Sequence, residues 1–176
     1  MEDVTGELVG ELVGEVVDVP YVPNYGETCA SSSMTMMLKG YDSSITFDDV
    51  LNKAGLPPII NYDAVDEWIR EEFDLTLEMY IYRRIDDILT CIDEGYPVMV
   101  LQVFSAQVHT GHNRVVIGYN LKKETLIVHD PSPLGPDYEM SFEYFDQLWK
   151  KWDKIGDWNV THFLWLIMPV DAADPI

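Results

Sequence analysis

The chain has 176 residues, of which 47% are hydrophobic and 12% aromatic, which fits one globular domain with a real core and argues against disorder. Its formal net charge of −20 makes nucleic acids and anionic membranes poor partners. No run reaches the roughly 18 apolar residues of a membrane span, the acidic N-terminus lacks signal-peptide features, and two distant cysteines do not form a disulfide framework. We therefore expect a cytoplasmic protein whose acidity reflects a solvated surface, with a preference for cationic ligands as the alternative.

The N-terminal segment repeats a Gly-Glu-Leu/Val-Val unit three times over residues 6–17. A helix is disfavoured there, because each glycine costs about 1 kcal/mol relative to alanine and the three glutamates would align like charges at i, i+4 spacing. The valines suit an extended segment leading to Val19. We predict an acidic arm over residues 1–18, with a packing or pairing role, and a single domain over residues 19–176.

The first predicted helix carries the first cysteine. A loop rich in proline and glycine leads to Thr28, a suitable N-cap, and Gly40 should end the helix. Cys29 then lies in or near the first turn, where the positive end of the helix dipole favours the thiolate, the form that attacks carbonyl groups. The alternative is a small cysteine packed beneath a helix, which is the commoner environment for this residue.

The remainder of the first half alternates helical patterns with one strand. In chain order, the prediction is a helix capped by Ser44 or Thr46 and ended by Gly55, a helix opened by Asn61, a strand over 76–82 and a helix over 84–94. Cys91 lies within the apolar pattern of the last of these helices, which favours a structural role for it.

The second half reads mainly as strands. The predicted elements are strands over 97–104, 112–119 and 124–130, a helix capped by Ser141 with an aromatic apolar face, and a final strand over 161–169. Strands joined by such short connections should pair antiparallel. Helices followed by an antiparallel sheet predict an α+β fold.

This arrangement suggests a constellation around the cysteine. If the two strands pair through a turn near residues 121–123, His112 and Asp130 lie close together at one end of the sheet. An imidazole beside a carboxylate is the arrangement that orients a general base and stabilises its charged form. With Cys29 facing it, the set would be suited to acyl transfer.

A metal site is the alternative interpretation of these residues. His109, His112, His129 and Asp130 are residue types that zinc accepts. Neighbouring residues of a strand point to opposite faces, however, so His129 and Asp130 should not join one cluster. We therefore expect neither a metal nor a cofactor.

Three blocks of sequence resemble the C39-like peptidases, papain-like cysteine peptidases related to the peptidase domains of bacteriocin exporters. The blocks are Val-Pro-Tyr-Val-Pro-Asn followed four residues later by Cys29, Gly-His-x-x-Val-Val-x-Gly-Tyr from Gly111, and Ile-Val-His-Asp-Pro from Ile127. The resemblance covers roughly residues 19–169 and implies a papain-like cysteine proteinase fold, with N-terminal helices packed on a C-terminal antiparallel sheet.

The resemblance also implies roles for individual residues. Cys29 would be the nucleophile, His112 the base and then the acid, and Asp130 the carboxylate that orients the ring. Where the family usually has a glutamine oxyanion donor, about five residues before the cysteine, this chain has Asn24. Its side chain can still donate but is one methylene shorter, and the alternative is an ordinary turn residue.

A second departure is Ala30, in a Cys-Ala-Ser sequence where these peptidases commonly show Cys-Gly-Pro.

Three functions follow from the resemblance. The first is a thiol hydrolase that cleaves a peptide or related amide in a peptide or protein substrate through an acyl-enzyme. The second is a domain that kept the fold, lost turnover and binds an extended peptide. The third is a thiol-dependent acyl transferase.

Overall fold

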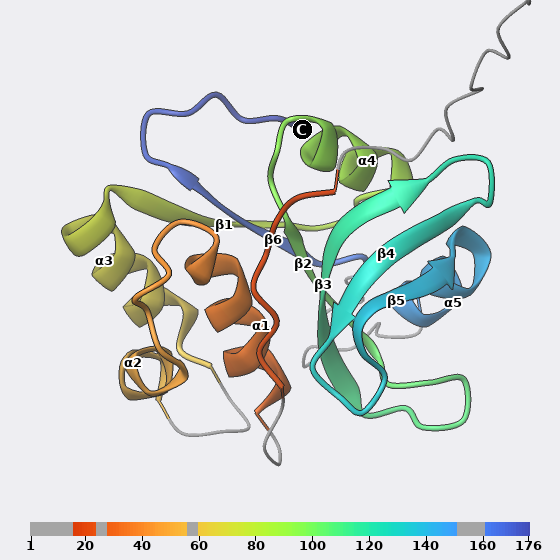
Figure 1. The fold of residues 1–176 in the computed structure, drawn as a ribbon, viewed down its shortest axis with the longest axis horizontal. Helices are drawn as coiled ribbons and strands as arrows, with labels where there is room; N and C mark the ends of the chain where they lie inside the picture. The colour runs from red at the N-terminus through yellow and green to blue at the C-terminus, as the bar shows by residue number, and fades with distance from the viewer. Residues whose placement is uncertain (1–15, 24–27, 56–59, 151–160) are drawn as a thin grey trace, which may run out of the picture.

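The computed structural model describes residues 16–23, 28–55, 60–150 and 161–176. The helices are α1 (Cys29–Lys39), α2 (Phe47–Ala54), α3 (Tyr62–Phe73), α4 (Ile85–Asp93) and α5 (Phe142–Lys150) (Figure 1). The strands are β1 (Leu75–Tyr80), β2 (Val98–Val103), β3 (Gly111–Asn120), β4 (Thr125–Asp130), β5 (Gly135–Ser141) and β6 (Leu164–Pro169).

The helix boundaries follow the local signals in the sequence. Thr46 caps α2 through a reciprocal capping box with Asp49, and the Asn61 side chain accepts a hydrogen bond from the first turn of α3. Thr28 occupies the N-cap position of α1, although its side chain makes no capping hydrogen bond, and Gly40 follows the last helical residue as predicted. The predicted helices of the first half are therefore confirmed within a residue or two.

The strands form one antiparallel sheet in the order β1-β6-β2-β3-β4-β5. The β3–β4 hairpin pairs Val115 with His129 and contains a register shift beside Gly118. This register brings the start of β3 and the end of β4 to the same end of the sheet. The prediction of an α+β fold with an antiparallel sheet is confirmed.

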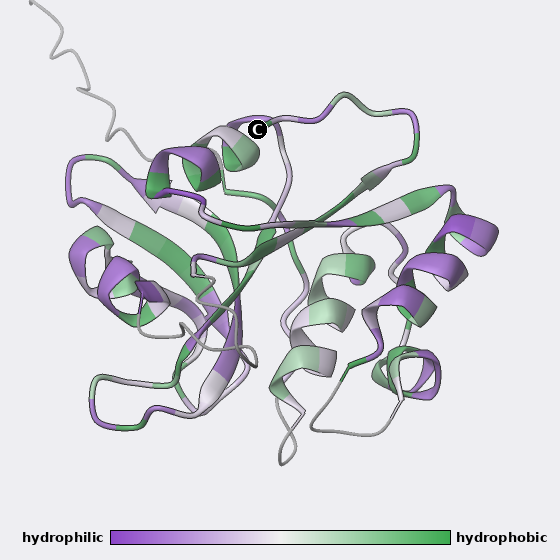
Figure 2. Cartoon of the chain, turned by 180° about the vertical axis from the view of Figure 1, so that it is seen from behind, coloured by the Kyte–Doolittle hydropathy of each residue, from purple (hydrophilic) through white to green (hydrophobic). Residues whose placement is uncertain are grey.

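Both faces of the sheet are buried, each beneath its own helices. In β3, Val115 and Ile117 join the core that contains residues of α1, α2 and α3, whereas Val116 joins the core that contains residues of α4 and α5. This alternation follows the two-residue period of a strand. Figure 2 shows the matching hydropathy, with α1 pale to green and the outer turns of α3 purple.

An extended segment, the N-terminal strap (residues 16–23), runs between α1 and the β3–β4 hairpin (Figure 1). The Val17 N–H donates to Ile117 O at 2.7 Å, His129 Nε2 lies 2.9 Å from Val19 O, and the Tyr21 hydroxyl donates to the backbone oxygen of Asp130 at 3.1 Å. The strap therefore docks along the sheet immediately before the chain reaches α1. Most of the Gly-Glu repeat lies in residues 1–15, outside the described residues, and the boundary proposed at residue 18 remains a prediction.

The sequence analysis did not identify β5. This strand begins Gly-Pro-Asp, residue types that are poor strand formers, and it pairs with β4 at the sheet edge.

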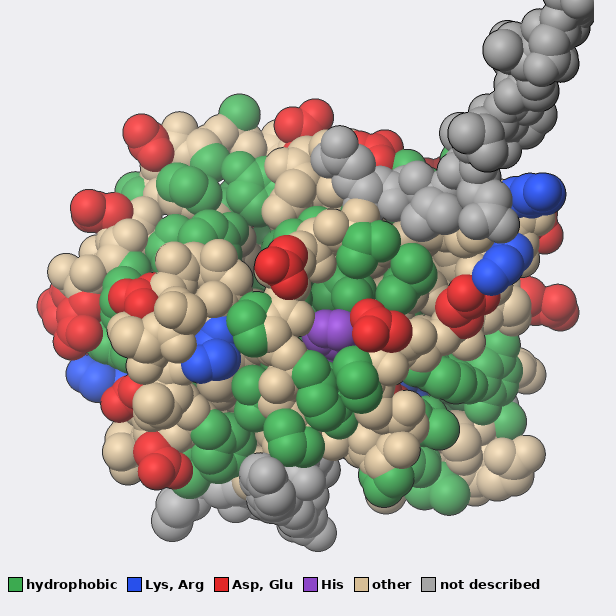
Figure 3. All heavy atoms as spheres, viewed as in Figure 1, with side chains coloured by type: hydrophobic (Ala, Val, Ile, Leu, Met, Phe, Trp, Pro, Cys, Tyr) green, Lys and Arg blue, Asp and Glu red, His purple; other side chains and the backbone are tan. Residues whose placement is uncertain are grey.

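Figure 3 shows carboxylate side chains scattered over the face in view, with few lysines and arginines between them. Within the described ranges, no helix combines the length and apolar character needed to cross a bilayer.

The contact between the strap and the hairpin depends on the absence of a side chain at Gly118. A Cβ atom there would lie 3.1 Å from Val16 Cγ2 and 3.4 Å from the Val16 Cα. We predict that Gly118→Val lowers the free energy of unfolding by about 1–3 kcal/mol, because its methyl groups displace the strap, and that Gly118→Ala costs less. Urea unfolding of the three proteins checks this, and a Gly118→Val protein as stable as the wild type would contradict it.

Candidate active site

Cys29 is the first residue of α1, and its side chain is partly exposed. The first backbone hydrogen bond of the helix runs from the Ser32 N–H to Thr28 O at 2.8 Å, so the amides of the first turn have no partners within the helix. These amides point along the positive end of the helix dipole. The sulfur therefore lies where an anion is stabilised.

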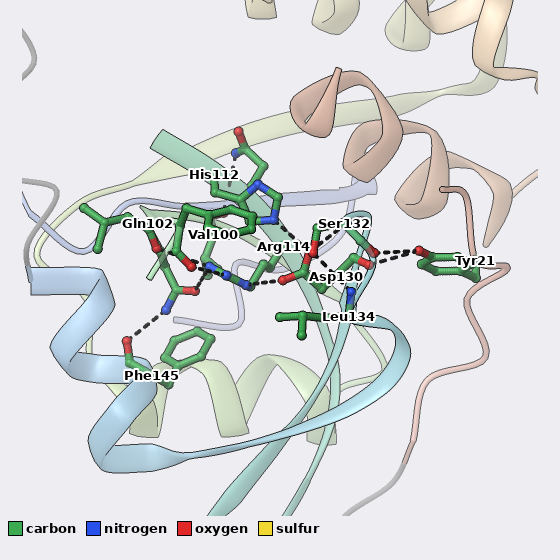
Figure 4. Close-up of polar contacts among 12 residues, drawn as sticks. Tyr21, Val100, Gln102, His112, Arg114, Asp130, Ser132, Leu134 and Phe145 are labelled. Carbon is green, nitrogen blue, oxygen red and sulfur yellow. Dashed lines mark hydrogen bonds and ion pairs between the residues drawn. The ribbon is translucent and has the colours of Figure 1, made fainter. Parts of the chain in front are cut away.

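His112 is the second residue of β3, and its ring is buried with 4% of the residue exposed. Its Nε2 lies 2.7 Å from Asp130 Oδ1, and the ring of Phe104 packs edge-on against it with centroids 4.9 Å apart. Cys29 interacts with the same imidazole, because His112 lowers the pKa of the thiol and Cys29 raises the pKa of the ring. The structure thus couples Cys29 to His112 and places His112 against Asp130; Figure 4 shows the contact of His112 with Asp130.

The pKa shifts of Cys29 and His112 favour a negative charge on the first and a positive charge on the second. Burial raises the pKa of the Cys29 thiol, but hydrogen bonds with His112 and with the backbone of Asn113 outweigh burial and bring it below its ordinary value. Burial lowers the pKa of His112, but hydrogen bonds with Asp130 and Cys29 raise it above its ordinary value. The opposite shifts favour a thiolate beside an imidazolium.

Asp130 has no exposed surface. Burial alone would raise its pKa, but His112 and Arg114 hold the pKa of this carboxyl well below its usual range. Oδ1 also accepts from the Ser132 N–H at 2.8 Å, and Oδ2 accepts from Arg114 Nε at 2.7 Å. The carboxylate is therefore ionised and fixed by partners on both oxygens (Figure 4).

Arg114 is a member of the site that the sequence analysis missed. It is only 1% exposed, and besides Asp130 it donates to Gln102 Oε1 at 3.0 Å and to the backbone oxygens of Val103 at 3.4 Å and Phe104 at 2.7 Å. The sequence did contain a signal, because Arg114 is the one Lys, Arg, Asp or Glu residue of β3 and directly precedes the apolar run Val115–Ile117. Such a residue is almost never fully buried without a partner.

Two other histidines and the second cysteine considered in the sequence analysis have other partners. His129 contacts the strap through Nε2 and accepts from the Asp137 N–H through Nδ1 at 3.3 Å, while the exposed His109 contacts Ala106 O. Across the described residues, no three His, Cys, Asp or Glu side chains are grouped as metal ligands. Cys91 is buried in α4. Asn24 lies outside the described residues.

Comparison with known proteins identifies the family. The Peptidase_C39 like family matches residues 16–160, which is most of the chain. No curated protein matches it.

Solved structures share the fold. A candidate C39-like peptidase from Bacillus anthracis aligns with a TM-score of 0.65 at 15% identity, covering 88% of this chain and 96% of that one. The peptidase domain of Streptococcus ComA, a bifunctional ABC transporter of a quorum-sensing pathway, aligns with a TM-score of 0.61 at 17% identity, covering 87% and 98%. A double glycine motif protease from an AMS/PCAT transporter, solved with the leader peptide, gives 0.60 at 18% identity, covering 88% and 94%.

These alignments confirm the predicted papain-like arrangement of helices on an antiparallel sheet. The family match over most of the chain confirms the resemblance seen in the three sequence blocks. The chain belongs to the Peptidase_C39 like family of cysteine peptidases.

Proposed function

We propose that the protein is a thiol hydrolase that cleaves a peptide or related amide bond, with Cys29 as nucleophile, His112 as base and acid, and Asp130 as the orienting carboxylate. The observation that carries the proposal is His112, which lies 2.7 Å from the buried, ionised Asp130 and whose pKa and that of the Cys29 thiol shift each other. Nucleophile, base and orienting group in this order are the minimum set for acyl transfer.

The reaction follows from the charges at the site. The Cys29 thiolate attacks the carbonyl carbon, and the carbonyl π electrons move to oxygen. The His112 imidazolium then protonates the leaving nitrogen as the C–N bond breaks, which releases the amine and leaves a thioester on Cys29. Water, deprotonated by the neutral His112, attacks the thioester, releases the carboxylic acid and restores the thiolate.

Asp130 contributes by remaining ionised throughout. Its Oδ1 faces His112 Nε2, which fixes the ring and leaves the other ring nitrogen, Nδ1, for proton transfer. The negative charge also stabilises the imidazolium that the resting state requires.

The oxyanion needs hydrogen-bond donors. The backbone N–H of Cys29 lies in the first turn of α1, where it has no partner within the helix, and this makes it one candidate. Asn24 is the proposed second donor, in the place where the family usually has glutamine.

A peptide or protein is the proposed substrate. The similar transporter protease was solved in complex with the leader peptide. This chain has the same fold and an ionisable thiol that is partly exposed rather than sealed in the core. The interpretation requires no metal or cofactor.

Hydrolysis is tested with a library of peptides from a digested proteome, incubated with the protein and analysed by mass spectrometry for new termini. We expect wild type and Cys91→Ala to produce the same cleavages, and Cys29→Ala to produce none, because of the two thiols only that of Cys29 has its pKa lowered by an imidazole. Cleavage that persists in Cys29→Ala would contradict the proposal. Bound but uncut peptides would indicate a binding domain, and amide products formed with an added amine would indicate an acyl transferase.

The reactivity of the two thiols with iodoacetamide should differ near neutral pH. The pKa of Cys29 is lowered, so its thiolate persists as the pH falls, whereas burial raises the pKa of Cys91 to about 12. Cys29 should therefore react faster, and His112→Ala should slow its reaction by about tenfold for each unit by which the pKa rises. His109→Ala is the matched histidine control, and equal slowing in both variants would contradict the Cys29–His112 pairing.

Replacing Asn24 tests the oxyanion donor. Asn24→Ala should reduce kcat by about 10²–10³, because one donor to the transition state is lost, without changing the rate of thiol alkylation. Asn24→Gln, which installs the residue usual in the family, should retain turnover. An Asn24→Ala enzyme with wild-type kcat would exclude Asn24 as an oxyanion donor and leave it the role of an ordinary turn residue.

A further inference from the structure

We propose that Arg114 is a positioning residue that holds the two groups flanking the His112 ring, the Asp130 carboxylate on one side and the Phe104 segment on the other. This inference rests on the proposed function of His112. The burial of Arg114 keeps it from contact with a substrate. Its contribution to the reaction would act through His112.

The first contact fixes the carboxylate. Arg114 Nε donates to Asp130 Oδ2 at 2.7 Å, while His112 Nε2 lies at the same distance from Oδ1. Ser132 N–H donates to Oδ1 as well. With a cation on each oxygen, rotation of the carboxylate would break one charge-assisted contact, so the oxygen that faces the imidazole is specified.

The second contact fixes the ring that packs against the imidazole. Another nitrogen of the same guanidinium donates to Phe104 O at 2.7 Å. The Phe104 ring lies edge-on to His112 at an interplanar angle of 72°. A single planar guanidinium thus ties the hydrogen-bond partner and the packing partner of His112 to the same rigid group. Figure 4 shows its contact with Asp130.

The guanidinium is itself anchored to the scaffold. Its Nη1 donates to Gln102 Oε1 at 3.0 Å, and Gln102 Nε2 donates to the backbone oxygen of Phe145 in α5 at 2.8 Å. Gln102 is directly opposite His112 in the β2–β3 register. The network therefore connects the base to two strands and a helix that surround it.

Stability alone does not account for this arrangement. Val116, two residues further along β3 on the same face, packs in hydrocarbon beneath α4 and α5. A buried ion pair is commonly matched or exceeded in stability by apolar residues of similar volume. A guanidinium that contacts both neighbours of a proposed catalytic base is better explained by the geometry it imposes.

Charge and geometry can be separated experimentally. The charged groups that face His112 are Cys29 from α1, Asp130 from β4 and Arg114 from its own strand. Arg114→Met removes both the positive charge and the planar, forked set of N–H donors of the guanidinium. Arg114→Lys keeps the charge but replaces the planar fork with a single ammonium that cannot hold both neighbours.

The experiment is an NMR pH titration of the His112 ring, together with kcat and KM for a cleaved peptide, in wild type, both Arg114 variants and Val116→Ala. Arg114→Met removes a positive charge that disfavours the imidazolium, so it should raise the pKa of His112 by about one unit. Arg114→Lys should leave that pKa close to the wild-type value and lower kcat by about tenfold or more with KM little changed, because the ring is no longer held. Val116→Ala is the matched control for a core truncation in the same strand.

The proposal is overturned if the folded Arg114→Met protein shows wild-type titration of His112 and loses no more kcat than Val116→Ala. If Arg114→Met does not fold, Arg114→Lys decides alone: full kcat overturns the proposal, and reduced kcat with an unchanged pKa supports it. The titration needs no substrate. A wild-type protein that cleaves nothing would end the proposed function, while the response of His112 would still report whether Arg114 controls it.

Discussion

The site depends on a single buried charge, the carboxylate of Asp130. It has no exposed surface and receives hydrogen bonds from His112, Arg114 and the Ser132 amide. An ionised carboxylate in the interior is costly unless it is paired and hydrogen-bonded, and here every oxygen is satisfied by the protein. This charge in turn makes a cationic imidazole favourable, and the cationic imidazole makes a thiolate favourable at Cys29.

The fold places these groups through two features that lie far apart in sequence. The β3–β4 hairpin brings the start of one strand beside the end of the next, which sets His112 against Asp130. The N-terminal strap crosses the same hairpin and delivers the chain to the start of α1, where the thiol meets the dipole of the helix. Both features depend on backbone hydrogen bonds, so the site is a consequence of sheet register and of strap docking rather than of local sequence.

Much of the fold could be predicted from the sequence because its signals are local. The capping residues Thr46 and Asn61, the stop at Gly40 and the apolar runs of β2 and β3 all appear in short windows. Strand β5 could not be predicted, because its first residues are poor strand formers and its pairing with β4 decides the outcome. Arg114 was missed because its partners come from β2, from the segment after it and from β4, and no local pattern connects them.

The central claim is that Cys29 and His112 share a proton, with the charge separated between them. Two coupled groups shift each other's titration, so removing the thiol must change the titration of the ring. The most direct measurement is the pKa of His112 by NMR in wild type and in Cys29→Ser. The account predicts a lower pKa of His112 in Cys29→Ser, because a hydroxyl does not supply the negative charge that stabilises the imidazolium; an unchanged pKa would contradict it.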